Sequence, residues 1–323
     1  MLMSEQGAEG RRSRASSVEF TPLVDRFQHR VDEAPERLAL VHSDGTCLSR
    51  RELWTEAEEC ASHLAEAGVV RGEIVTLCLP NNRAWASAYL GILQLGCVPA
   101  TLPSTTDTAA LASASAAIGS RAVLNAPRES SLVEAYPSDR QARTVAPRWN
   151  SGSVTVAVID SPERRTDGPG FDQLMFTSGT TGQPRAVMHT EQSLAALNAG
   201  LADTYGLGEH TPLFMGSPLG HATGVMHGIR LSLFLGAPLL VQEKWNAPQA
   251  VEMITRHDAY FSIAATPFLR DLVDYAIETG VTQEKFLKVF LCGGAPVPSA
   301  LVNEAQAHYP GMFVSPEWAM TEG

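Results

Sequence analysis

Apolar residues follow two alternating patterns along most of this chain. Apolar positions three or four residues apart predict amphipathic helices. One such helix starts at Ser49 and stops at Gly68, and another starts at Thr266 and stops at Gly280. Between the helices, short uninterrupted apolar runs predict buried strands. These runs cover residues 74–79, 98–102, 122–124, 154–159, 174–176, 239–241, 261–265 and 289–292. The alternation is typical of an α/β fold with parallel sheets.

Breaks in the pattern indicate how the chain is organised. An Asp44-Gly45 turn between apolar runs predicts a hairpin, whereas residues 125–150 show no regular pattern. A charged linker at residues 161–170 is the best internal boundary. We therefore expect a disordered tail (1–17), a first α/β subdomain (18–165) and a second one (166–323). Because the chain stops in a loop, we also expect an incomplete C-terminus, without a small C-terminal domain.

The residues after the run at 174–176 cannot extend a strand or form a helix. They are Thr177, Ser178, Gly179, Thr180, Thr181, Gly182, Gln183, Pro184 and Arg185. The glycines let the backbone approach a ligand, while hydroxyl and N–H groups turn toward an anion. Arg185 adds a permanent positive charge. The stretch predicts a phosphate-binding loop, with a solvated turn as the alternative. The spacing of a Walker A loop is excluded, because no Lys follows the second glycine at the required position.

Composition argues against some classes of function. The chain has 323 residues and a formal net charge of −11, which argues against a general nucleic-acid binder. Five scattered cysteines form no C-x-x-C pair, and nine histidines show no ligand spacing, so a metal held mainly by the protein is not expected. No secretory signal or membrane span is visible, which predicts a cytoplasmic protein.

Other turns at strand ends offer further candidates. Gly293 and Gly294 could let a flat ring lie against the backbone, although the sequence alone favours a plain turn. Trp318 is a stacking platform or a core residue, and Glu322 is a Mg²⁺ ligand or a surface carboxylate. His221, in a Gly/Thr loop, lines a pocket or is a satisfied core histidine.

The order of these motifs resembles the adenylate-forming superfamily of acyl-CoA synthetases, peptide-synthetase adenylation domains and luciferases. Residues 176–184 match its aromatic-Thr-Ser-Gly-Thr-Thr-Gly-x-Pro phosphate loop throughout. Arg185 stands where the family usually has Lys, and Ala186 and Ala319 stand where it usually has Gly. The resemblance covers residues 20–323 and implies the fold of the family's large N-terminal domain, with two parallel-sheet α/β layers.

The resemblance also implies a role for each matching residue. Thr180, Thr181 and Arg185 would hold the β- and γ-phosphates of ATP, beside Ser178, Gly179 and Gly182. Thr177 and Glu322 would hold Mg²⁺, and Thr321 would contact the α-phosphate. Trp318 would border adenine, near Gly293, Gly294 and Ala295. The acyl pocket would be lined by His221, Thr223, Gly224 and Met320. Thr181, Arg185 and Glu322 would act in catalysis.

The function implied is activation of a carboxylic acid to an acyl-adenylate, followed by transfer to the thiol of CoA. The details look most like ligases for medium-chain or alicyclic acids, such as cyclohexanecarboxylate. An Asp, an Arg and a late catalytic Lys that the family carries further on are not found in these residues. The alternatives are a nucleotide-binding protein without turnover and an adenylation domain that loads a carrier protein.

Overall fold

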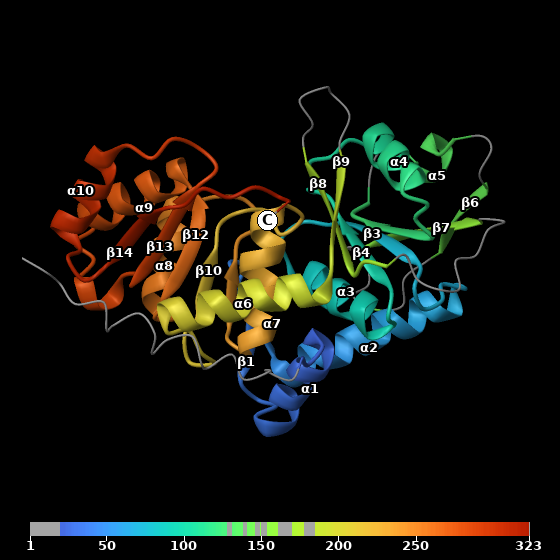
Figure 1. Ribbon diagram of the computed structural model, residues 1–323, viewed down its shortest axis with the longest axis horizontal. Helices are drawn as coiled ribbons and strands as arrows, with labels where there is room; N and C mark the ends of the chain where they lie inside the picture. Colours follow the sequence, from blue (N-terminus) through green and yellow to red (C-terminus); the bar gives the residue numbers. More distant parts are fainter. Residues whose placement is uncertain are drawn as a thin grey trace, which may run out of the picture.

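Two seven-stranded sheets organise the computed structural model of the chain (Figure 1). The structure describes residues 20–127, 131–137, 141–145, 149, 154–160, 170–177 and 185–322. Both sheets have parallel strands at their centre and antiparallel strands at an edge. The α/β class predicted from the alternation of apolar runs is therefore confirmed, although the sheets are mixed rather than wholly parallel.

The first sheet contains the strands on either side of the predicted phosphate loop. Its order is β6 (Gln141–Val145), β7 (Thr155–Asp160), β5 (Ala122–Asn125), β3 (Ile74–Cys78), β4 (Val98–Thr101), β8 (Gln173–Thr177) and β9 (Arg185–His189). Strands β3, β4, β5 and β8 are parallel, and their nearly unbroken apolar character fits strands buried on both faces.

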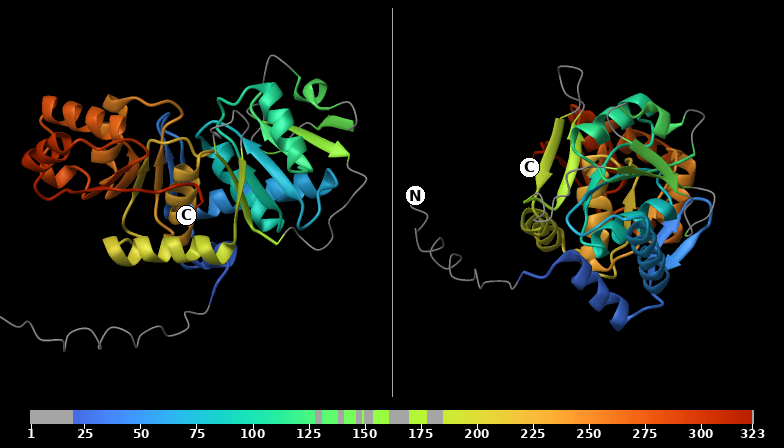
Figure 2. Two further views of the ribbon diagram at one scale, coloured as in Figure 1. Left: turned by 45° about the horizontal axis from the view of Figure 1, so that its top comes forward. Right: turned by 90° about the vertical axis from the view of Figure 1, so that its right-hand side faces the viewer.

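The second sheet gathers most of the later strands. Its order is β14 (Phe313–Pro316), β13 (Val289–Gly293), β12 (Phe261–Ala265), β10 (Leu213–Met215), β11 (Leu239–Val241), β1 (Leu38–His42) and β2 (Cys47–Ser49). Strands β10, β12, β13 and β14 run parallel, so their carboxyl ends lie along one edge. That edge faces the middle of the molecule, close to the β8–β9 hairpin and the end of the chain (Figures 1 and 2).

Helices cover both sheets. They are α1 (Leu23–Glu33), α2 (Arg50–Glu66), α3 (Arg83–Gln94), α4 (Thr108–Ala117), α5 (Leu132–Ala135), α6 (Glu191–Tyr205), α7 (Arg230–Leu235), α8 (Ala247–Arg256), α9 (Thr266–Glu278) and α10 (Ser299–His308), with a 3₁₀ turn at Gln283–Lys285. A π-helical segment, Gly224–Ile229, leads directly into α7. Searched through the described residues, no helix has the length and apolar character needed to cross a membrane.

Local signals in the sequence explain several helix boundaries. Ser49 accepts a hydrogen bond from the Glu52 N–H, and the Glu52 carboxylate accepts one from the Ser49 N–H, which makes a capping box. Helix α1 has Pro22 at its N-cap, with no side-chain hydrogen bond. Proline is favoured at this end of a helix because it has no N–H to satisfy.

The sheets do not follow the boundary expected near residue 165. The early strands β1 and β2 pair with β11 in the second sheet, whereas β8 and β9 belong to the first sheet. The strands that flank the predicted phosphate loop therefore extend the earlier sheet, not the later one. Residues 1–17, the predicted tail, lie outside the described residues, as does most of the linker at 161–170.

A buried polar network joins elements from both halves of the chain. The guanidinium of Arg230 is fully buried, forms an ion pair with Glu191, and donates to the Tyr89 hydroxyl at 3.1 Å. Tyr89 in turn donates to Gln173 at 2.8 Å, at the start of β8. Glu191 also accepts the Leu23 N–H at the start of α1. This network ties α1, α3, α6, α7 and β8 together beneath the hairpin.

Candidate functional site

The predicted phosphate loop connects two paired strands. Strand β8 pairs with β9 in antiparallel register, and Thr177 lies opposite Arg185. The backbone thus holds the two ends of the loop together. Strand β9 was not expected from the sequence. Ser178, Gly179, Thr180, Thr181 and Gly182 lie outside the described residues, so their predicted roles are not placed by the structure.

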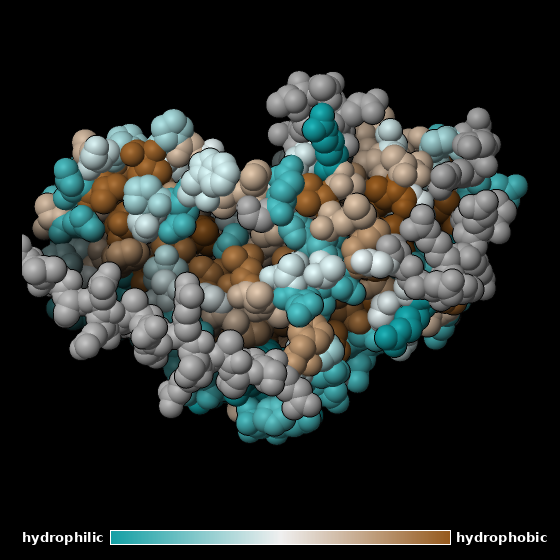
Figure 3. Space-filling model, in the orientation of Figure 1, coloured by the Kyte–Doolittle hydropathy of each residue, from teal (hydrophilic) through white to brown (hydrophobic). Residues whose placement is uncertain are grey.

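A cavity of about 390 Å³ opens at the carboxyl ends of β10, β12 and β13. Strand ends of this kind are where α/β proteins bind ligands. Six residues singled out from the sequence line the cavity: His221, Thr223, Gly293, Gly294, Met320 and Thr321. Residues Gly224, Ala295, Trp318 and Glu322 do not line it, and neither do Thr177 and Arg185 at the loop ends. The apolar surface visible between the two halves of the molecule lies in this region (Figure 3).

The two glycines at the end of β13 serve different purposes. Gly294 has a φ of +76°, a conformation that other residues rarely adopt, so the turn at this position needs glycine. Gly293 instead makes room for the C-terminal segment. A Cβ there would lie 2.8 Å from the carbonyl oxygen of Glu317.

His221 lies at the exposed side of the cavity, so its interpretation as a core histidine is wrong. Its Nδ1 accepts the Thr223 N–H at 3.4 Å, which leaves the ring proton on Nε2. Desolvation by the surrounding residues lowers the pKa of His221. A neutral ring with a fixed N–H donor suits hydrogen bonding to a carboxylate or phosphate oxygen.

The C-terminal segment, residues 317–322, crosses from the second sheet to the hairpin. The Glu317 N–H donates to the Cys292 carbonyl at 2.7 Å. Farther along, Nε2 of His189 donates to the Thr321 carbonyl at 2.8 Å. Burial lowers the pKa of His189, although this carbonyl opposes the decrease. One histidine of β9 therefore holds the segment against the strand that leaves the phosphate loop.

Trp318 and Glu322 are surface residues of this segment. The indole of Trp318 is 85% exposed, so the core interpretation is wrong and a flat face is free for stacking. Glu322 is exposed as well. Within the described residues, no three His, Cys, Asp or Glu side chains gather as a metal site. Thr177 and Glu322 still offer the hard oxygen donors that Mg²⁺ takes alongside phosphate oxygens.

Two ionisable residues of the cavity were not predicted from the sequence. His227 comes from the π-helical segment, and Glu317 directly follows β14. Glu317 accepts a long 3.5 Å hydrogen bond from the Tyr205 hydroxyl. No short motif contains either residue, and only the folded chain brings them beside His221 and Gly293.

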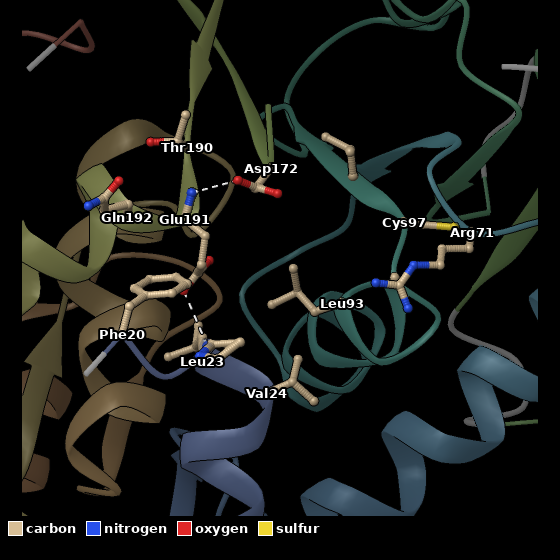
Figure 4. A pocket seen from close by; sticks show the side chains of 13 residues that line it. Phe20, Leu23, Val24, Arg71, Leu93, Cys97, Asp172, Thr190, Glu191 and Gln192 are labelled. Carbon is tan, nitrogen blue, oxygen red and sulfur yellow. Dashed lines mark hydrogen bonds between the residues drawn. The ribbon is translucent and has the colours of Figure 1, made fainter. Parts of the chain in front are cut away.

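A larger cavity of about 590 Å³ lies away from these residues, near the starts of α1 and α6 (Figure 4). None of the residues singled out from the sequence lines it. Its two carboxylates already have partners, because Asp172 accepts the Glu191 N–H at 2.7 Å and Glu191 accepts the Leu23 N–H. Size alone therefore does not identify the functional site.

Comparison with known proteins shows similarity along most of the chain. The family model described as AMP-binding enzyme matches residues 27–323. The chain is 25% identical over 300 residues to the medium-chain fatty-acid–CoA ligase of Escherichia coli K12, covering 88% of this chain and 53% of the relative. It is 24% identical to a 4-coumarate–CoA ligase of Pinus taeda, covering 96% and 60%. The chain thus spans about half the length of the first curated relatives it matches.

Solved structures share the fold. The inhibitor-bound N-terminal domain of FACL13 from Mycobacterium tuberculosis superposes with a TM-score of 0.76 at 20% identity, covering 94% of this chain and 77% of that one. The o-succinylbenzoate coenzyme A synthetase of Bacillus subtilis in complex with AMP gives a TM-score of 0.73 at 21% identity, covering 94% and 74%. Given the family match over nearly its whole length, the chain belongs to the AMP-binding enzyme family.

Proposed function

We propose that this chain carries the adenylate-forming site of an acid–thiol ligase, in which ATP activates a carboxylic acid for transfer to CoA. The observation that carries the proposal is the cavity at the strand ends. It brings His221, Gly293 and Thr321 together from distant parts of the sequence. The same segment that supplies Thr321 is bound to the strand leaving the phosphate loop.

In the proposed reaction, a carboxylate oxygen of the acid attacks the α-phosphorus of ATP. The bond from that phosphorus to the bridging oxygen breaks, and pyrophosphate leaves with its electron pair. The thiol of CoA then adds to the acyl carbon, loses its proton, and displaces AMP. The protein acts mainly by positioning and charge stabilisation, as is usual in phosphoryl chemistry.

Each residue has a defined task in this proposal. The Nε2–H of His221 orients the acid carboxylate, and the Thr321 hydroxyl donates to the α-phosphate. Trp318 borders the adenine next to Gly293, Gly294 and Ala295. Thr180, Thr181 and Arg185 hold the outer phosphates, assisted by the backbone of residues 178–182. Thr223, Gly224 and Met320 shape the entrance to the acyl pocket.

Mg²⁺ is the metal that the family resemblance implies. Thr177 and Glu322 would bind it together with phosphate oxygens, and the ion would neutralise charge on the leaving pyrophosphate.

The cavity walls favour an apolar acid of moderate size. Apolar side chains supply half of the lining, including Ala222, Met226, Ala264, Ala265 and Met320. CoA is the proposed thiol substrate. The chain is also 26% identical to part of a dimodular nonribosomal peptide synthase of Bacillus subtilis, which favours the thiol of a carrier protein as the second candidate for the acceptor. We propose a cytoplasmic site of action.

Pyrophosphate release with Mg·ATP and a panel of carboxylic acids tests this function. We expect release that depends on the acid and is strongly reduced by Thr181→Ala, with the half-buried Thr255→Ala as control. Release that no acid increases, or that Thr181→Ala leaves unchanged, would count against the proposal. Mg·ATP binding without acid-dependent release would instead favour the nucleotide-binding alternative.

His189 offers a separate prediction about nucleotide binding. His189→Ala removes the donor to the Thr321 carbonyl, and a hydrogen bond of this kind contributes about 1 kcal/mol. We expect the Kd for ATP to rise about fivefold, because the segment with Thr321 and Trp318 loses its attachment. His189→Gln, which keeps a donor, should recover part of the affinity, and the exposed His308→Ala should have no effect. Equal affinities across all four proteins would show that the contact does not position the segment.

A further inference from the structure

The cavity at the strand ends has one charged side chain in its wall. Among the described residues that line it, Glu317 is the only Asp, Glu, Lys or Arg. The two histidines of the wall, His221 and His227, do not balance this charge. Burial lowers the pKa of both rings, to about 4 for His227, so both are neutral near pH 7. The carboxylate of Glu317 therefore has no positive neighbour in the described wall.

The backbone fixes Glu317 beside the cavity. Its N–H donates to the carbonyl of Cys292 at 2.7 Å, directly before Gly293 of the cavity wall. A Cβ added at Gly293 would lie 3.6 Å from Cβ of Glu317 and 2.8 Å from the Glu317 carbonyl oxygen. The Glu317 side chain therefore starts against the wall, in space that glycine at position 293 leaves open.

The protein satisfies the Glu317 carboxylate only in part. Within the described residues, its one hydrogen bond comes from the Tyr205 hydroxyl to Oε1, at a long 3.5 Å. Contacts with the rings of Phe261 and Phe313, whose centroids are 6.0 and 5.9 Å away, hold the Tyr205 ring in place. The second oxygen, Oε2, has no partner in this part of the chain, yet it is not among the polar atoms enclosed without a hydrogen bond. Because Glu317 is half-buried, Oε2 is accessible to solvent or to a ligand.

An acid that fills the cavity would change the surroundings of this carboxylate. Half of the lining residues are apolar, and the acid would displace water that solvates Glu317 in the free protein. A carboxylate that loses water without gaining a counter-charge or a donor costs free energy. A plain alkyl tail offers neither, whereas an ammonium group offers a positive charge and three N–H donors. Like charges repel, so the acid's own carboxylate is not the group that suits Glu317.

We propose that the acid accepted by this cavity carries a protonated amino group on an otherwise apolar tail, and that Glu317 is the residue that selects it. This inference rests on the proposed function, since it assigns the cavity to the acid. The apolar part of the wall, which includes Met226, Ile263 and Ala264, suits the rest of such a tail. A site that pairs with a polar group of its substrate discriminates well against the analogue that lacks the group.

Hydrolysis-stable acyl-adenylate analogues test the inference without requiring turnover. The probes are hexanoyl sulfamoyl adenosine and its derivatives with one amino group, or one hydroxyl group, at successive carbons of the tail, titrated calorimetrically at pH 7. We expect one amino derivative to bind at least about tenfold more tightly than the hexanoyl compound. Glu317→Gln should remove most of this preference, because the amide keeps an acceptor for Tyr205 but loses the charge. The exposed Glu278→Gln is the matched control and should keep the full preference.

The outcomes separate the inference from the proposed function. If the hexanoyl compound binds as tightly as every amino derivative, or if the preference survives in Glu317→Gln, selection by Glu317 is refuted while the acyl site stands. If a hydroxyl derivative binds best, the wall selects a neutral polar group rather than a cation, and the inference is again refuted. If no analogue binds more tightly than AMP alone, the cavity does not hold the acid, and both proposals fail.

Discussion

Arg230→Met is expected to lower the free energy of unfolding by about 3–5 kcal/mol, the usual cost of removing one partner of a buried ion pair. The Arg230 side chain is 1% exposed and its partner Glu191 is 16% exposed. Burial opposes the charge on the guanidinium, but Tyr89 and Glu191 outweigh this effect and raise the pKa of Arg230. Methionine would fill much of the same space but leave the Glu191 carboxylate without its counter-charge.

Urea denaturation of matched variants measures this effect. Arg256→Met is the control, because Arg256 makes an exposed pair with Glu252 one helical turn away and should change stability by less than about 0.5 kcal/mol. Adding Glu191→Gln to Arg230→Met should recover part of the loss, since the neutral amide can still accept the Leu23 N–H. If Arg230→Met costs no more than the control, the network does not hold the two halves of the chain together.

Gly224→Ala is expected to destabilise the protein by about 1–3 kcal/mol and to weaken binding at the cavity. An added Cβ would lie 2.2 Å from the carbonyl oxygen of Pro218 and 2.6 Å from Cα of Leu219. These are backbone atoms of the loop that carries His221, so the loop must move to relieve the contact. Gly224 therefore acts through packing, although it does not line the cavity itself.

Gly200→Ala provides the matched control. Gly200 lies inside α6 with nothing within 4 Å of an added Cβ, and alanine is favoured over glycine in a helix by about 1 kcal/mol. Thermal denaturation should thus show a lower Tm for Gly224→Ala and an unchanged or higher Tm for Gly200→Ala. If the two variants have similar Tm values, the close contact of the Pro218 and Leu219 backbone with Gly224 has little effect on stability.

The sequence predicted features that depend on neighbouring residues. The helix start at Ser49 and the hairpin around Gly45 were both confirmed, because turn and cap chemistry acts within a few positions. The Gly293-Gly294 turn was also correctly placed at a strand end. Family motifs located six residues of the cavity lining, including His221 and Thr321.

Features that depend on distant contacts were not predicted. Strand β9 exists because it pairs with β8, yet its sequence follows a loop motif and has no strong pattern of its own. The pairing of β1 with β11 joins segments about two hundred residues apart, which no local pattern encodes. His227 was missed for a similar reason, since only the folded chain brings it to the cavity wall beside His221.

The measurement that tests the central claim most directly is a calorimetric comparison of AMP with a hydrolysis-stable acyl-adenylate analogue. If the cavity at the strand ends and the C-terminal segment form one adenylate site, the analogue should bind at least about tenfold more tightly than AMP. It should also compete with Mg·ATP, since both would contact Thr321 and the phosphate loop. An analogue that binds no better than AMP, or that leaves Mg·ATP binding unchanged, would contradict the account.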